Sequence, residues 1–166
     1  MAFPARADRF FLGGHLCKIK EEDLTLHIIV DGFDTVWGER IRQVRTVVFS
    51  LEQKIDPALD LDGQDPFSLH VLAEMSGQFV GTGRMLPDGH IGRLAVLNSV
   101  REKGIGEKLV AKLFGIAKQK GMSRVFLGAQ EHAVGFYEKL GFQKYGFPYE
   151  EAGIQHIHME KMIPLS

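Results

Sequence analysis

The segment Arg101-Glu102-Lys103-Gly104-Ile105-Gly106 decides the fold, because it opens an amphipathic helix expected over residues 104–121. The start of a helix presents unpaired N–H groups and about half a positive charge, which suits an anion. Gly104 and Gly106 lack the Cβ atoms that would keep a phosphate away from the backbone, and Arg101 and Lys103 add positive charge. The pattern predicts a phosphate-binding turn. The alternative is a loop without a ligand in front of a surface helix.

Two familiar phosphate-binding motifs do not fit this segment. A P-loop requires Gly-Lys-Ser/Thr, whereas Gly106 is followed by Glu107-Lys108-Leu109, so no hydroxyl is placed for magnesium. A dinucleotide fingerprint requires a third glycine at the position of Leu109 and an acidic residue about twenty positions further on. Residues 118–124 contain no acidic residue, so that motif is excluded as well.

Outward from this helix, hydrophobic periodicity predicts one domain of strands and helices, in an α/β or α+β arrangement. The expected strands are 25–30, 68–75, 78–85, 90–97, 125–128, 144–147 and 155–162, and the expected helices are 34–53, 104–121 and 132–140. Residues 54–66 contain Asp-Pro and Asp-Gly pairs and are expected to form a loop. Residues 1–16 lack periodicity and are interpreted as an N-terminal extension of a single domain spanning residues 1–166.

The composition is that of an ordinary globular protein, with 166 residues, 45% hydrophobic and 25% charged. A net charge of −1 provides no field that would draw the chain to nucleic acid or to an anionic membrane. Cys17 is the single cysteine, which excludes an internal disulfide and a cysteine-based metal site and favours a reducing cytoplasm. Arg6, Asp8 and Arg9 interrupt the apolar residues near the start, so no signal peptide is expected.

Beyond the glycine-rich turn, the sequence resembles the GNAT superfamily of N-acetyltransferases. The resemblance rests on the order of Arg93–Val96, Arg101–Gly106, Leu127–Gln130 and Ala133–Phe142, with Phe136-Tyr137 followed by Gly141-Phe142. Within the superfamily, the chain is similar to the ElaA/YjcF-like subgroup through Val48-Phe49, Glu52-Gln53 and Gly153-Ile154-x-His156-x-x-Met159. The resemblance implies a central mixed, mostly antiparallel, splayed sheet with helices on both faces.

The resemblance also implies how acetyl-CoA is held. Backbone groups of Leu94, Ala95 and Val96, at a bulge in the central strand, would pair with the pantetheine arm. The pyrophosphate would lie on the glycine-rich turn, held by the N–H groups of Gly104, Ile105 and Gly106 and by neighbouring groups around Lys103 and Lys108, with Arg101 at the same end. Gln130 occupies a position where many relatives carry asparagine, so it is expected to make a polar contact with the arm.

The resemblance places Tyr137 beside the sulfur of CoA, as the general acid for the departing thiolate. Packing of its ring in the helix together with Phe136 is the alternative, as for most buried aromatic residues. Acyl transfer also requires a neutral amine, because a primary amine with a pKa near ~10.4 must lose a proton before it attacks.

The residue that takes this proton is less clearly indicated. His156 and His158 lie two positions apart in an expected strand and therefore face the same side. His156 is the candidate catalytic residue of this pair, and a structural hydrogen-bonded histidine is the alternative. A metal pair would need a third ligand, and none stands out, so no metal is expected. Glu52, Glu74 and His70 are further candidate bases, and an ordered water is another.

The sequence thus predicts an acetyl-CoA-dependent N-acyltransferase that modifies a primary amine of a small molecule or peptide by direct attack in a ternary complex. A non-catalytic module that binds CoA thioesters with the same fold is the alternative. The acceptor amine, the preferred acyl chain and the oligomeric state, with a homodimer as one possibility, are not determined by any motif.

Overall fold

The computed structural model describes residues 24–30 and 32–165. The expected extension over residues 1–16 and Cys17 lie outside this range. No helix in the described part of the chain is long and apolar enough to cross a membrane.

The first four strands form one antiparallel sheet in the order β1-β2-β3-β4. Their bounds are β1 Leu24–Ile29, β2 Leu69–Met75, β3 Gln78–Met85 and β4 Ile91–Val96. The turn that joins β2 to β3 contains Ser76 and Gly77, both with positive φ, so the predicted strands 68–75 and 78–85 form an antiparallel hairpin.

The remaining strands form a second antiparallel sheet in the order β5-β7-β6. Their bounds are β5 Arg124–Gln130, β6 Gln143–Glu151 and β7 Ile154–Met162. Strand β6 is longer than the predicted residues 144–147, because Gly146 and Pro148 are accommodated inside it. Gly146 has φ +65°, and the register with β7 shifts between Tyr145 and Tyr149.

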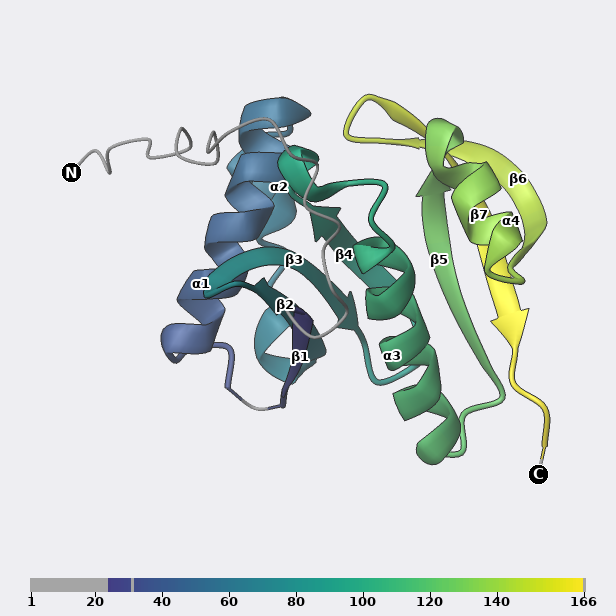
Figure 1. Cartoon of the computed structure of the whole chain (residues 1–166). Coiled ribbons are helices and arrows are strands. Elements are labelled where there is room, and N and C mark those ends of the chain that lie inside the picture. The colour runs from purple at the N-terminus through teal and green to yellow at the C-terminus, as the bar shows by residue number, and fades with distance from the viewer. Residues whose placement is uncertain (1–23, 31, 166) are drawn as a thin grey trace.

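The two sheets meet at one point and then separate. His90 forms an isolated parallel bridge with Phe126, and their rings stack with centroids 5.0 Å apart. Beyond this junction β4 pairs only with β3, and β5 pairs with β7. Figure 1 shows β4 and β5 running apart from one another. This parallel bridge between antiparallel sheets confirms the predicted mixed, splayed arrangement.

Helices cover both faces of the first sheet, as predicted (Figure 1). The α-helices are α1 Val36–Arg45, α2 Pro57–Asp60, α3 Ile105–Gln119 and α4 Val134–Lys139, of which α1 and α3 cover the first sheet and α4 contacts β5. On one face, Ile41 and Val44 of α1 pack against Leu72 of β2. On the other face, Leu109 and Leu113 of α3 are fully buried in the larger core cluster.

Two segments differ from the expected helices and loops. The first helix begins at the Thr35 cap, within the predicted range 34–53, but its continuation Thr46–Glu52 is π-helical. The predicted loop 54–66 contains α2, with Asp56 accepting a hydrogen bond from the Ala58 N–H at its cap, and a 3₁₀ turn, Asp65–Phe67. A segment rich in turn residues therefore forms ordered structure, because its aspartates find partners in the rest of the fold.

Candidate active site

A cleft of about 1060 Å³ lies where β4 and β5 separate. Strand β4, the start of α3 and the last turn of the π-helix line one wall, and β5, α4 and the β6–β7 hairpin line the other. Ten of the twelve predicted site residues lie on these walls: Leu94, Ala95, Val96, Arg101, Gly104, Ile105, Gly106, Gln130, Tyr137 and His156. The cleft therefore brings together residues from five separate segments of the sequence.

A bulge exposes the edge of β4 to the cleft. The register between β3 and β4 shifts between Thr82 and Arg84, and opposite this shift Arg93 adopts a φ of +52°. A non-glycine residue in this conformation is uncommon and marks a local irregularity in the strand. The backbone of Leu94–Val96 follows directly, on the side of β4 that has no strand beside it.

The glycine-rich turn leads into α3 in a left-handed conformation. Gly104 is the N-cap residue with φ +77°, which only glycine adopts without strain, and a Cβ there would meet no atom within 4 Å. The N–H of Lys108 donates to the Gly104 carbonyl at 3.1 Å, so the N–H groups before it are those left without an intrahelical partner. A Cβ on Gly106 would lie 3.3 Å from the ring of Phe136, so this glycine also permits close packing of α4.

Three cationic residues expected near the pyrophosphate occupy different environments. Arg101 lines the cleft, but its guanidinium donates to the Val96 carbonyl at 2.9 Å and to both carboxylate oxygens of Glu52. Arg101 therefore links the end of β4 to the π-helix through these hydrogen bonds. Lys103 and Lys108 do not belong to the lining of the cleft, and the N–H of Lys108 is used within the helix. The unpaired N–H groups at the start of α3 are thus the main candidate for binding an anion.

Gln130 connects the two walls of the cleft. Its side-chain amide donates to the Gln53 side-chain oxygen at 2.9 Å, and both residues line the cleft. Gln130 lies at the end of β5 and Gln53 follows the π-helix, so this hydrogen bond spans the gap between the sheets.

Tyr137 is buried in α4 and faces the cleft. Its ring makes edge contacts with Phe136 and Phe142, with centroids 5.0 Å and 5.7 Å apart. Burial raises the pKa of Tyr137 to about 12, so its hydroxyl is protonated at neutral pH and can act as a proton donor. Tyr137 therefore packs against aromatic neighbours and also lines the cleft.

His156 enters the cleft from β7, on the same wall as Tyr137 but on the opposite face of the second sheet. Its Nδ1 lies 2.7 Å from the Ile154 carbonyl oxygen, which can only accept a hydrogen bond. In the neutral ring Nδ1 therefore carries the hydrogen, and Nε2 keeps a lone pair that can accept a proton. His158 lies on the same side of β7, since Tyr149 stacks on both histidines, but it does not line the cleft.

Comparison with known proteins decides the family of this chain. A family model described as an acetyltransferase (GNAT) domain matches residues 44–163. The chain belongs to the GNAT acetyltransferase family. Protein ElaA of Escherichia coli K12 is 32% identical over 73% of this chain and 84% of its own length. The N-acetyltransferase YjcF of Bacillus subtilis is 34% identical over 71% of this chain and 87% of its own.

The fold agrees with this assignment. The crystal structure of an acyl-CoA N-acyltransferase from Pseudomonas aeruginosa superposes with a TM-score of 0.73 and 29% identity, covering 83% of this chain and 99% of the other. The predicted superfamily and its ElaA/YjcF-like subgroup are thus confirmed, as is the predicted splayed sheet with helices on both faces. As a GNAT domain, the chain is of the class that transfers acyl groups from CoA thioesters.

Two of the candidate bases lie away from the GNAT cleft, which corrects the prediction. His70 is 1% exposed, and its Nε2 lies 2.9 Å from the Asp65 carbonyl oxygen; burial lowers the pKa of this histidine. Glu74 bonds to His27 at 2.7 Å and does not line the cleft. Glu52 does line the cleft, but its carboxylate is engaged by Arg101. Among the described residues, no group of three or more His, Cys, Asp or Glu is placed to hold a metal ion.

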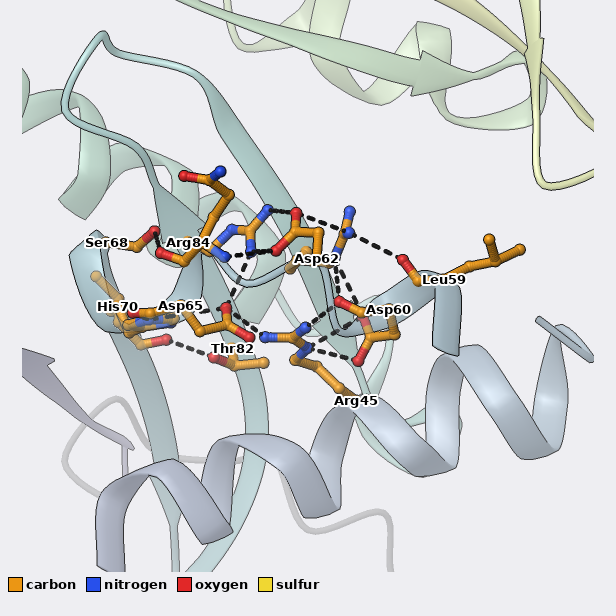
Figure 2. A network of polar contacts seen from close by, with 12 residues as sticks. Arg45, Leu59, Asp60, Asp62, Asp65, Ser68, His70, Thr82 and Arg84 are labelled. Atoms are coloured by element: carbon orange, nitrogen blue, oxygen red, sulfur yellow. Dashed lines mark hydrogen bonds and ion pairs between the residues drawn. The ribbon is translucent and has the colours of Figure 1, made fainter. Parts of the chain in front are cut away.

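Beside the cleft, three arginines and three aspartates form a closed ring of ion pairs, here called the Arg–Asp ring (Figure 2). Each arginine contacts two aspartates, and each aspartate contacts two arginines. Around the ring, the N···O distances are 2.9 Å for Arg45–Asp60, 3.1 Å for Arg93–Asp60, 3.1 Å for Arg93–Asp62, 2.7 Å for Arg84–Asp62, 2.9 Å for Arg84–Asp65 and 2.8 Å for Arg45–Asp65.

The Arg–Asp ring ties α1, the segment around α2, β3 and the bulge of β4 into one unit. Arg84, Arg93 and Asp60 also line the cleft. The hydrogen bond from Arg84 holds the pKa of Asp62 well below its usual range. Burial alone would raise the pKa of Asp65, but hydrogen bonds and positive charge from Arg45 and Arg84 outweigh burial and lower it. Asp62 and Asp65 are therefore charged at neutral pH, and the ring holds Arg93 at the bulge.

Proposed function

We propose that this GNAT domain transfers the acetyl group of acetyl-CoA to a primary amine by direct attack in a ternary complex. The observation that carries the proposal is the placement of two groups able to transfer protons in one cleft, on opposite faces of the second sheet. Tyr137 reaches the cleft from α4 and His156 from β7. Across the cleft from both lies the free edge of β4, which leads to the unpaired N–H groups of α3.

Different residues bind the cofactor and transfer the protons in the proposed reaction. Leu94–Val96 would align the pantetheine arm, and the start of α3 would hold the pyrophosphate. The amine nitrogen forms the new bond to the acyl carbon, the carbon–sulfur bond breaks, and its electron pair leaves with the sulfur. Tyr137 donates its proton to that sulfur, and Nε2 of His156 takes the proton that the amine loses. The two side chains return to their starting forms by exchanging protons with solvent.

The direct test is release of the CoA thiol from acetyl-CoA, followed with a thiol reagent across a panel of primary amines. We expect release to require the amine and to yield the N-acetylated product, detected by mass spectrometry. His156→Gln should lower the rate about 100-fold, in the range of general-base catalysis. His27→Gln is the control, because His27 lies on β1 and outside the cleft lining. Binding of acetyl-CoA without amine-dependent release would instead indicate a binding module.

A further inference from the structure

Tyr149 is a second tyrosine in the cleft, and its hydroxyl rests on the backbone of β5. A Cβ at position 128 would overlap the Tyr149 hydroxyl oxygen, so only the glycine found there leaves room for it. Both Tyr149 and Gly128 line the cleft. The hydroxyl therefore occupies a fixed place on the wall where β5 borders the gap between the sheets.

Two histidines hold the ring of Tyr149 in this place. It stacks on His158 with centroids 4.3 Å apart and on His156 with centroids 5.5 Å apart. No hydrogen bond from its hydroxyl to another group in the described chain accompanies this packing, so the hydroxyl is available to a ligand. Burial, followed by the charge of Glu151, raises the pKa of Tyr149, which keeps the hydroxyl protonated.

Tyr149 approaches the gap from the face opposite to Tyr137. Side chains of β5 alternate, so that Leu127 and Ala129 are buried in the core together with Tyr137, whereas Gly128 lies on the other face beneath Tyr149. Two tyrosines thus flank the same gap from its two sides. Gly128 lies only two residues from Phe126, where β4 and β5 join.

An arm that starts at α3 and follows β4 toward this junction brings its thioester end nearest to Gly128, while the pyrophosphate stays at the far end. We propose that the Tyr149 hydroxyl donates a hydrogen bond to the carbonyl oxygen of the bound acyl group and stabilises the negative charge that develops there. This assignment rests on the proposed function. In this role Tyr149 donates a hydrogen bond to the carbonyl oxygen of the acyl group and transfers no proton.

The carbonyl oxygen is a better partner for this hydroxyl than the amine. A hydroxyl that donates to a neutral amine would tie up the lone pair that must attack the carbon. A hydrogen bond donated to the carbonyl oxygen becomes stronger as negative charge develops on that oxygen. This lowers the activation barrier of acyl transfer. The neighbouring Nε2 of His156, which carries a lone pair, suits the amine instead.

Tyr149→Phe tests the proposal, because it removes only the hydroxyl and keeps the ring that stacks on His158. The dissociation constants of acetyl-CoA and of free CoA are measured by calorimetry for both proteins. We expect Tyr149→Phe to weaken acetyl-CoA about threefold to tenfold and free CoA by less than about twofold, since free CoA lacks the carbonyl. Where turnover is measured, kcat should fall about 100-fold.

Tyr145→Phe is the matched control. Tyr145 lies on the same strand and stacks on the same His158 at 5.3 Å, but it does not line the cleft. It should leave both dissociation constants and the melting temperature unchanged. Equal weakening of both ligands by Tyr149→Phe, or no weakening of either, would overturn the role of Tyr149.

The same measurements separate this inference from the proposed function. Selective weakening of acetyl-CoA in a protein that shows no amine-dependent thiol release supports Tyr149 and refutes catalysis. Amine-dependent release with unchanged acetyl-CoA binding and kcat in Tyr149→Phe supports catalysis and refutes Tyr149. Failure of the wild-type protein to bind acetyl-CoA would overturn both.

Discussion

At the scale of single residues, the cleft assigns different chemistry to side chains of the same type. Tyr137 is buried and held by two phenylalanine rings, Tyr149 rests on Gly128, and Tyr145 stacks outside the cleft. The positions of Tyr137 and His156 in the cleft could be anticipated because both belong to motifs with fixed spacing. Tyr149 could not, because the bulge at Gly146 that brings it into the cleft comes from pairing with β7, which no local pattern reveals.

Tyr137→Phe should lower kcat about 100-fold, because the thiolate would then leave without a proton donor. The dissociation constant of acetyl-CoA should change by less than about twofold, since the hydroxyl acts only as the carbon–sulfur bond breaks. The phenylalanine ring keeps the edge contacts with Phe136 and Phe142, so the melting temperature serves as the control for folding. An unchanged kcat in steady-state assays would exclude Tyr137 as the acid.

At the scale of elements, the start of α3 is the part of the site that sequence predicts best. Its apolar stripe and its left-handed Gly104 are local properties of one segment. The segment 54–66 is the opposite case. Its aspartates resemble turn residues, and their partners Arg45, Arg84 and Arg93 come from three other elements. Such ion pairs depend on the whole fold and cannot be predicted from the local sequence.

Gly106→Trp should abolish measurable binding of acetyl-CoA. A Cβ at this position already lies 3.3 Å from Phe136, so an indole must project into the cleft or displace α4. Gly115→Trp is the matched control on the same helix, where a Cβ would meet no atom within 4 Å. It should bind acetyl-CoA with the affinity of the wild-type protein in calorimetry. Equal affinities of the two variants would show that the turn does not hold the pyrophosphate.

At the scale of the whole molecule, the Arg–Asp ring joins α1, the segment around α2, β3 and β4 at the border of the cleft. Asp65 is 3% exposed and contacts Arg45 and Arg84. Removing its carboxylate would therefore leave these two buried arginines with one negatively charged partner fewer. The ring contributes to stability only as a complete set, because a buried charge without its partner is costly.

Asp65→Asn should lower the free energy of unfolding by about 3–5 kcal/mol, the cost of breaking a buried ion pair. Asparagine has nearly the same shape, so the loss reports the missing charge. Asp56→Asn is the control: Asp56 is exposed and caps α2, and asparagine caps helices equally well, so the change should stay within ~0.5 kcal/mol. Urea unfolding measures both variants, and equal midpoints would contradict the role of the ring.

The contribution of Asp65 should also depend on pH. Hydrogen bonds and positive charge from Arg45 and Arg84 hold the folded pKa of Asp65 below its ordinary value, so the native state holds fewer protons than the unfolded chain in acid. The stabilisation is therefore complete at neutral pH and declines as the pH falls below about 4. The difference in unfolding free energy between wild type and Asp65→Asn should shrink between pH 6 and pH 3.5. A difference that stays constant over this range, measured by urea unfolding, would argue against an ionised Asp65.

The closed Arg–Asp ring also limits how this acyltransferase can acquire new acceptors. Each member neutralises two neighbours, so substitutions within the ring will not have additive effects, and single changes meet a stability penalty before any gain. The tip of the β6–β7 hairpin borders the same cleft through Glu151 and Ala152, and neither residue belongs to the ring. We therefore expect laboratory evolution for altered substrate range to accumulate changes in the hairpin while Asp60, Asp62 and Asp65 are retained.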